Sequence, residues 1–115
     1  MNMEAPPAPP SEMARSAASA AAYLKTLAHE GRLMILCHLG SGEKSVGELE
    51  GLLDIRQAAV SQMLARLREE GLVATRRDGK TIYYSLADQN TYEVIQLLYR
   101  LFCGPADADS TKTSC

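Results

Sequence analysis

The most reactive side chains in this chain of 115 residues belong to its three cysteines, Cys37, Cys103 and Cys115. Cys37 lies in the apolar stretch LMILCHLG, and Cys103 follows another apolar stretch 66 positions later. Free cysteine is among the residue types most often found in protein cores, so a single thiol in such a stretch usually fills space. Two thiols that meet in the fold can instead be joined covalently. The sequence therefore offers either a core cysteine or half of a dithiol switch.

A second set of polar side chains lies along a predicted helix over residues 56–70. Apolar residues recur there at the spacing of one buried helical face: Val60, Met63, Leu64 and Leu67. The other face carries short and amide-bearing side chains: Gln57, Ala58, Ser61, Gln62, Ala65 and Arg66. Gln and Ser can hydrogen-bond to base edges in the major groove of DNA, and Arg can pair with guanine or phosphate. Each residue alone is explained as hydrophilic surface, but the group indicates a helix that reads DNA.

The charges of the chain are distributed unevenly. Its net charge is −2, yet residues 56–80 carry +3 and the other 90 residues carry −5. Positive charge that is concentrated in one segment of an acidic chain is typical of a local surface for a polyanion such as nucleic acid.

The elements that must position these side chains are mostly helical. Aliphatic residues are plentiful and aromatic residues make up 5% of the chain, which favours packed helices over an aromatic-rich sandwich or barrel. The length suits one domain. We expect a disordered arm over residues 1–10, a domain over 11–103 and a flexible tail over 104–115. Helices are predicted over 11–27 with Ser11 as N-cap, over 32–39 and over 88–102.

The middle of the chain reads as a helix-turn-helix followed by a hairpin. Ser45 and Glu48 form a capping-box signature that opens a short helix over residues 45–53, with a turn at 51–54 before the helix over 56–70. In GLVATRRDGKTIYYSL, β-branched and aromatic residues flank Asp78-Gly79, a dipeptide suited to a tight hairpin turn. Arg77 and Lys80 bracket that turn and could enter the minor groove or bind phosphates; Arg76 is a weaker candidate for the DNA backbone.

The stretches SVGELEGLL and VSQMLARLREEGLVATRRDGKTIYYSL resemble the ArsR/SmtB family of small dimeric bacterial repressors, over roughly residues 20–103. The resemblance implies a mainly α fold with a small β-hairpin, a winged helix-turn-helix that binds operator DNA as a homodimer in the bacterial cytoplasm, at the nucleoid. A wide apolar stripe near the C-terminus agrees with a partner subunit: Val94, Ile95, Leu97, Leu98, Leu101 and Phe102. Where relatives often place a capping Ser, this chain has Arg56, a poor N-cap that we expect to touch a phosphate.

Metal sensors of this family commonly carry a Cys-x-Cys pair in the third helix or Asp/His ligands in the last one. This chain has neither, and His29 and His38 are its two histidines, so a four-ligand zinc site is difficult to assemble. We interpret His29 as a packed or hydrogen-bonded structural residue, and we predict no metal and no cofactor.

Cys37 and Cys103, within LMILCHLG and YRLFC, resemble the persulfide-sensing SqrR/BigR-like subgroup. The resemblance implies that the second and last helices pack together and that reactive sulfur species such as glutathione persulfide link the two thiols, which releases DNA and derepresses sulfide-metabolism genes. A direct disulfide needs Cα atoms within about 7 Å, so added sulfur atoms would bridge a wider gap. The alternative keeps the fold but senses arsenite or another thiophilic metal. Under the persulfide interpretation Cys115 is accessory or inert, whereas under the alternative a third thiol could help to hold trivalent arsenic.

Two further classes of function are weaker. A thiol enzyme is disfavoured because the chain lacks Cys-x-x-Cys, a βαβ pattern and a thiol at a helix start. A winged helix used only for protein contacts predicts no salt-dependent DNA binding. The opening MNMEAPPAPP has no apolar core, and no stretch approaches the roughly 18 apolar residues of a membrane span, so we expect neither export nor a membrane partner. In a reducing cytosol the three cysteines should be free thiols.

Overall fold

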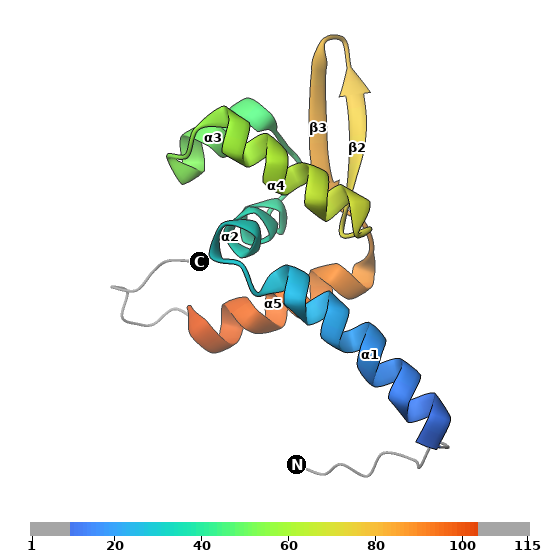
Figure 1. Cartoon of the computed structure of the whole chain (residues 1–115). Helices are drawn as coiled ribbons and strands as arrows, with labels where there is room; N and C mark the ends of the chain where they lie inside the picture. Colours follow the sequence, from blue (N-terminus) through green and yellow to red (C-terminus); the bar gives the residue numbers. More distant parts are fainter. Residues whose placement is uncertain (1–9, 104–115) are drawn as a thin grey trace.

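The computed structural model describes residues 10–103 (Figure 1). In chain order, its helices and strands are α1 (Pro10–Leu27), α2 (Glu30–Leu39), β1 (Lys44–Ser45), α3 (Val46–Leu53), α4 (Gln57–Glu69), β2 (Val73–Asp78), β3 (Thr81–Leu86) and α5 (Gln89–Phe102). The prediction of a mainly helical winged helix-turn-helix is confirmed. The predicted arm over 1–10, apart from Pro10, and the predicted tail over 104–115 lie outside the described residues.

The core is one apolar cluster around α2 and α4. Ile35 and Leu36 of α2 are fully buried, and Ile95 of α5 packs into the same cluster. On α4, the predicted buried face is confirmed: Val60, Leu64 and Leu67 are fully buried, and Met63 packs against them. Because this face is fixed in the core, the opposite face of α4 points outward.

The ends of the first two helices differ slightly from prediction. Ser11 lies inside α1 and not at its N-cap, since the helix already includes Pro10, which fits a first helical turn because no N–H is needed there. Helix α2 begins two residues before the predicted start, because the His29 side chain caps it: Nδ1 accepts a hydrogen bond from the Arg32 backbone N–H at 3.3 Å. The interpretation of His29 as a hydrogen-bonded structural residue is confirmed.

The predicted capping box at α3 is confirmed. Ser45 Oγ accepts the backbone N–H of Glu48 at 3.1 Å, and Glu48 Oε1 accepts the backbone N–H of Ser45 at 2.8 Å. The helix ends at Leu53 as predicted, so the turn that follows it is shorter than the predicted turn over 51–54. Asp54 then takes a left-handed conformation with φ 58°, which turns the chain toward the start of α4.

The sheet has three strands in the order β1-β3-β2, whereas the sequence predicted two. The missed strand β1 pairs Lys44 with Tyr84 and Ser45 with Tyr83. The hairpin of residues 73–86, called the wing below, projects from the helices in Figure 1. Asp78 pairs with Thr81, so the turn is centred on Gly79-Lys80, one residue later than predicted, with a positive φ at Gly79. A glycine at the first turn position suits a tight hairpin, and Lys80 therefore lies at the tip.

Within residues 10–103, no helix combines the length and the apolar character that crossing a membrane would require.

Candidate DNA-binding surface and cysteine pocket

The outer face of α4 presents the side chains that were predicted to read DNA. Gln57, Ser61 and Gln62 are all exposed, and so is Arg66 one turn further on. Arg56 is the N-cap residue of α4 and makes no side-chain hydrogen bond to the helix. Its exposed side chain therefore lies beside the start of the outer face of α4. We call this outer face, with Gln57, Ser61 and Gln62, the reading face.

Arg66 forms an ion pair within its own helix. Its Nε lies 3.2 Å from Oε2 of Glu70, four residues later. Both side chains are exposed, and such surface pairs contribute little to stability. A DNA phosphate could therefore replace Glu70 as the partner of Arg66 at small cost.

The basic residues of the wing fall into two groups. Arg77 and Lys80 are exposed near its tip. Arg76 instead donates two hydrogen bonds to the carboxylate of Glu43 and stacks 4.8 Å from the ring centroid of Tyr83. The hydrogen bond from Arg76 lowers the pKa of Glu43, and the carboxylate raises the pKa of Arg76. Arg76 is thus engaged in an intramolecular ion pair on the surface, although the sequence suggested a contact with the DNA backbone.

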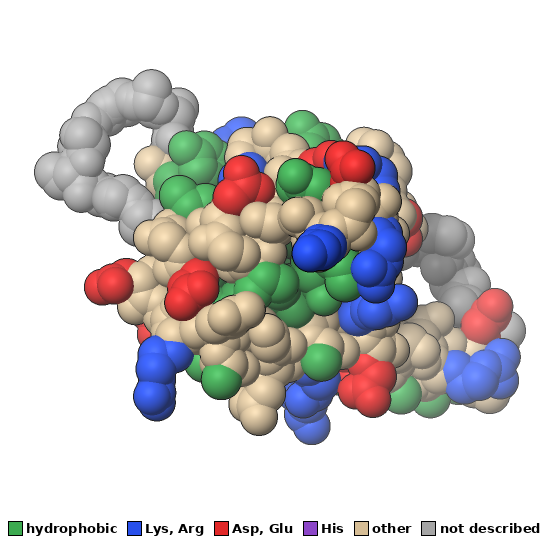
Figure 2. Space-filling view, turned by 90° about the horizontal axis from the view of Figure 1, so that it is seen from above, with side chains coloured by type: hydrophobic (Ala, Val, Ile, Leu, Met, Phe, Trp, Pro, Cys, Tyr) green, Lys and Arg blue, Asp and Glu red, His purple; other side chains and the backbone are tan. Residues whose placement is uncertain are grey.

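Figure 2 views the molecule from above, the side of the wing in Figure 1. Several Lys and Arg side chains gather to one side of the centre of this face, and Asp and Glu side chains are scattered around them. This end of a chain with net charge −2 therefore carries a local group of cations.

Cys37 opens onto a pocket between α2 and α5. The pocket, called the cysteine pocket below, is lined by Cys37, His38, Gly40, Ser41, Ile95, Gln96 and Tyr99. Cys37 is a free, half-buried thiol, and burial raises its pKa. The pKa of His38 is lowered, mainly by burial and also by the charge of Lys44. Because burial raises its pKa, the Cys37 thiol is predominantly protonated at neutral pH.

Cys103 caps the C-terminus of α5, where its backbone N–H donates to the Tyr99 carbonyl at 2.8 Å. It is half-buried and disulfide-bonded, whereas Cys37 is free, so the two are not joined to each other here. The expectation of a free thiol at Cys103 was wrong, because an argument from the redox compartment does not determine which thiols meet in space. Cys115 lies outside the described residues.

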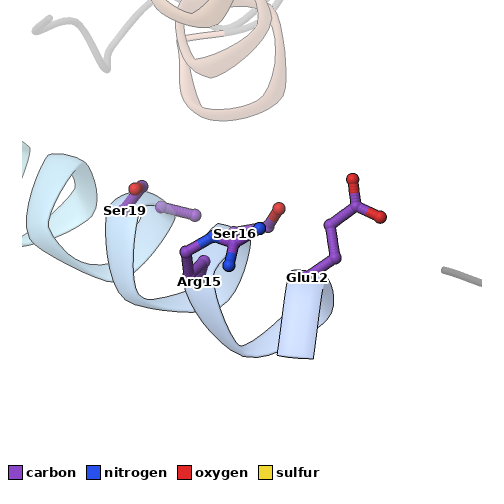
Figure 3. Close-up of a pocket in the computed structure, with 5 residues that line it drawn as sticks. Glu12, Arg15, Ser16 and Ser19 are labelled. Carbon is purple, nitrogen blue, oxygen red and sulfur yellow. The ribbon is translucent and has the colours of Figure 1, made fainter. Parts of the chain in front are cut away.

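Two other features of the described residues lead to no site. No group of three or more His, Cys, Asp or Glu side chains among residues 10–103 is placed to hold a metal ion. A surface hollow on α1 is lined by Glu12, Arg15, Ser16, Ser19 and Ala20 (Figure 3). All five residues belong to one exposed helix, so no second element encloses the hollow.

Comparison with known proteins identifies the family. Residues 29–75 match the family described as bacterial regulatory protein, arsR family. The biofilm growth-associated repressor of Agrobacterium fabrum is 52% identical over 95 residues, which are 83% of this chain and 81% of the relative. The chain belongs to the ArsR family.

Solved structures of similar transcriptional regulators have the same fold. Reduced HlyU from Vibrio cholerae gives a TM-score of 0.77 at 47% identity, covering 80% of this chain and 97% of HlyU. The repressor BigR from Xylella fastidiosa gives a TM-score of 0.76 at 41% identity, covering 90% of this chain and 98% of BigR. These likenesses support the BigR-like subgroup. The relatives are transcriptional regulators, so the chain is a DNA-binding regulator and not a thiol enzyme.

Sequence reasoning missed several residues around both surfaces. Gln96 and Tyr99 line the cysteine pocket, but as ordinary helix residues they gave no signal. Glu43 is 33 positions from Arg76, and no local pattern in this ArsR-family sequence pairs the two. Gly40 also lines the pocket, and an added Cβ there would lie 3.2 Å from the Cys37 carbonyl oxygen, a tight approach, and in ordinary contact at 3.7 Å with Cγ2 of Ile95.

Proposed function

We propose that this ArsR-family regulator is a homodimeric repressor that binds operator DNA while Cys37 and Cys103 are reduced. Reactive sulfur species such as glutathione persulfide then link the two cysteines, which releases the DNA and derepresses genes of sulfide metabolism. The protein would act in the bacterial cytoplasm, at the nucleoid. The observation that carries the proposal is the cysteine pocket, which is lined both by Cys37 of α2 and by Tyr99 of α5.

The position of Tyr99 supports a meeting of the two cysteines. Tyr99 lies one helical turn before Cys103, and the hydrogen bond from the Cys103 N–H to the Tyr99 carbonyl keeps that turn intact. One turn of helix rises about 5.4 Å. The pocket that holds the Cys37 thiol therefore reaches to within one turn of Cys103. A chain of added sulfur atoms would cover such a gap more easily than a direct disulfide, which requires Cα atoms within about 7 Å.

Glutathione persulfide is the oxidant in the linking reaction. Each cysteine thiolate takes the outer sulfur of one glutathione persulfide, which leaves a protein persulfide and releases glutathione. The outer sulfur of one protein persulfide then attacks the cysteine sulfur of the other, and hydrogen sulfide leaves. The product is a trisulfide, with one added sulfur between Cys37 and Cys103. The reaction starts from the form in which the disulfide of Cys103 has been reduced.

The environments of the two cysteines argue against fast reaction with peroxide. Burial raises the pKa of this thiol, so little thiolate is present at neutral pH to react with a dilute oxidant. Cys103 lies at the C-terminus of α5, where the helix dipole disfavours an anion. Neither cysteine therefore has the electropositive setting of a fast peroxide-reactive thiol.

For DNA binding, we assign base contacts to Gln57, Ser61 and Gln62 on the reading face. Arg56 and Arg66 would bind phosphates beside it, and Arg77 and Lys80 would reach the minor groove or the backbone from the wing. All seven side chains are exposed, which such contacts require.

A dimer is supported by apolar side chains that the described residues leave uncovered. On α5, Leu101 is 63% exposed and Phe102 is 76% exposed, and Leu24 of α1 is 58% exposed. Clustered exposed apolar side chains are typical of a protein interface. With α1 and α5 at the interface, the two reading faces would meet successive major grooves about 34 Å apart.

Intact mass spectrometry combined with DNA titration tests the proposal. The reduced protein is exposed to glutathione persulfide, hydrogen peroxide or arsenite. We expect a mass gain from sulfur only with persulfide, a peptide that joins Cys37 to Cys103, and DNA affinity weakened by about 5- to 150-fold, the usual range for coupled sites.

Single replacements of the cysteines provide the controls. Cys37→Ser and Cys103→Ser should each abolish the response, and Cys115→Ser should retain it. An unchanged response in Cys37→Ser or Cys103→Ser would contradict the switch. DNA release by arsenite alone would establish the metalloid sensor instead.

A further inference from the structure

The segment that follows α2 contacts both the cysteine pocket and the wing. Gly40 and Ser41 line the pocket together with Cys37. Two residues after Ser41, Glu43 binds the wing residue Arg76. Only six positions therefore separate the pocket thiol from a carboxylate that holds the wing.

The segment is tied to itself by hydrogen bonds. Ser41 Oγ donates to the His38 carbonyl at 2.9 Å, and Lys44 Nζ donates to Ser41 Oγ and to the Gly42 carbonyl, each at 3.2 Å. Displacement of Ser41 would therefore be transmitted to Lys44, which belongs to β1.

The far end of the segment meets the wing in two ways. Strand β1 pairs Ser45 with Tyr83 of β3. Arg76 of β2 pairs with the same Tyr83 and stacks on its ring. Its guanidinium donates two hydrogen bonds to the carboxylate of Glu43. The backbone pairing holds the middle of strand β3, and the Glu43–Arg76 pair adds a fork with two hydrogen bonds, a geometry that restricts direction as well as distance.

We propose that Glu43 and Arg76 are positioning residues that connect the cysteine pocket to the wing, so that a change in the pocket alters the orientation of the wing. This inference rests on the proposed function in taking the pocket as the sensing site. The ion pair is exposed, with side-chain exposures of 53% for Arg76 and 39% for Glu43. Exposed pairs add little to stability, so its removal should leave the fold intact while weakening the connection.

The test changes the pocket without using persulfide. In full-length protein that carries Cys103→Ser and Cys115→Ser, the Cys37 thiolate is treated with methyl methanethiosulfonate above neutral pH. The thiolate displaces methanesulfinate and forms Cys37–S–S–CH₃, which fills part of the pocket. Hydrogen exchange of the backbone amides of β2 and β3 is then measured before and after modification, and mass spectrometry verifies complete labelling.

We expect modification to change the exchange rates of the wing amides about fivefold or more, the lower end of typical coupling between sites. In Glu43→Gln the change should fall below about twofold, since the amide loses the charge that grips Arg76. Arg76→Lys should act in the same direction, because an ammonium cannot form the two-pronged contact. Glu93→Gln, which removes an exposed carboxylate of α5, serves as the control and should behave like the parent.

Two results would overturn the inference: no change at the wing of the parent, or an equal change in the parent and in Glu43→Gln. The proposed function is judged separately by the persulfide titration. If persulfide fails to link the cysteines while methylthiolation still alters the wing through Glu43, the sulfur switch is wrong and the connection stands. If persulfide releases DNA but Glu43→Gln makes no difference at the wing, the switch stands and the connection is wrong.

Discussion

The DNA-binding half of this ArsR-family chain and its cysteine half place their functional side chains in opposite environments. The reading face of α4 and the tip of the wing are exposed to solvent, so contacts with a partner there would depend on charge and on hydrogen bonds. Cys37 is half-buried between two helices, and burial raises its pKa. One helix is therefore enough to present the predicted reading surface, whereas the proposed sensing pocket needs two helices to meet.

The largest expected difference is between substitutions on the buried face and on the exposed face of α4. Leu64→Ala should lower the free energy of unfolding by about 2–5 kcal/mol, because Leu64 is fully buried and the substitution leaves a cavity. Ser61→Ala, on the reading face, should change it by no more than about 0.5 kcal/mol while weakening DNA binding. Urea unfolding and DNA titration measure both effects. Equal losses of stability would show that the reading face also supports the core.

A smaller effect separates base reading from backbone binding. Gln62→Ala should remove about 1–3 kcal/mol of discrimination at one base pair, because an amide that pairs with a base edge is lost. Lys80→Ala should instead weaken binding to all sequences alike and reduce the slope of log affinity against log salt by about 1. Titrations against operator variants at several salt concentrations measure both quantities. A change of base preference in Lys80→Ala would reverse the assignment.

The capping box provides a weaker test, at the first helix of the helix-turn-helix. Ser45→Ala should cost about 1 kcal/mol of unfolding free energy, because the Glu48 backbone N–H loses its acceptor. Ser11→Ala is the matched control, since Ser11 is exposed inside α1 and is not a cap. Thermal or urea unfolding of both variants gives the comparison. A cost at Ser11 as large as that at Ser45 would argue against the cap as the cause.

The smallest expected effect is a dependence of stability on pH at the start of α5. Asp88 accepts the backbone N–H of Thr91 at 2.9 Å, and this hydrogen bond lowers the pKa of its carboxyl. Because the folded-state pKa is the lower one, the stabilisation is present above the unfolded-state pKa, about 4, and is lost as the pH falls through the folded-state value.

Asp88→Asn isolates the charge from the cap. Asparagine caps a helix about as well as aspartate but does not titrate, so the variant should lose less stability than the parent in this acidic range. Urea midpoints measured between neutral and acidic pH check the difference. Identical pH profiles would assign the acid sensitivity to other carboxylates.

Sequence reasoning predicted features that depend on neighbouring residues. The apolar spacing from Val60 to Leu67 specified which face of α4 is buried, and the Ser45–Glu48 motif gave the start of α3. Sequence reasoning failed at the hairpin turn, where two overlapping dipeptides compete for the turn position. Asp78-Gly79 and Gly79-Lys80 both suit a tight turn, and the strand pairing of Asp78 with Thr81 selects the second.

Other parts of the site depend on residues that are remote in the chain. Two residues are too few to show a strand period, so β1 becomes visible only when Tyr83 and Tyr84 pair with it. Arg76 gave no sign of its partner because Glu43 belongs to a different segment. The packing of α2 on α5 was expected from the family resemblance, and it is present. The pairing state of Cys103 was not predictable, because spacing along the chain does not determine which thiols come together.

Ser45 has two duties, since it pairs with Tyr83 in the sheet and caps α3. The wing is therefore not structurally independent of the helix-turn-helix. Deleting residues 73–86 to make a minimal DNA-binding fragment would strip β1 of its partner strand and loosen the residue from which α3 starts. For an engineer who wishes to transplant this hairpin onto another regulator, the portable unit must extend back to include residues 43–48.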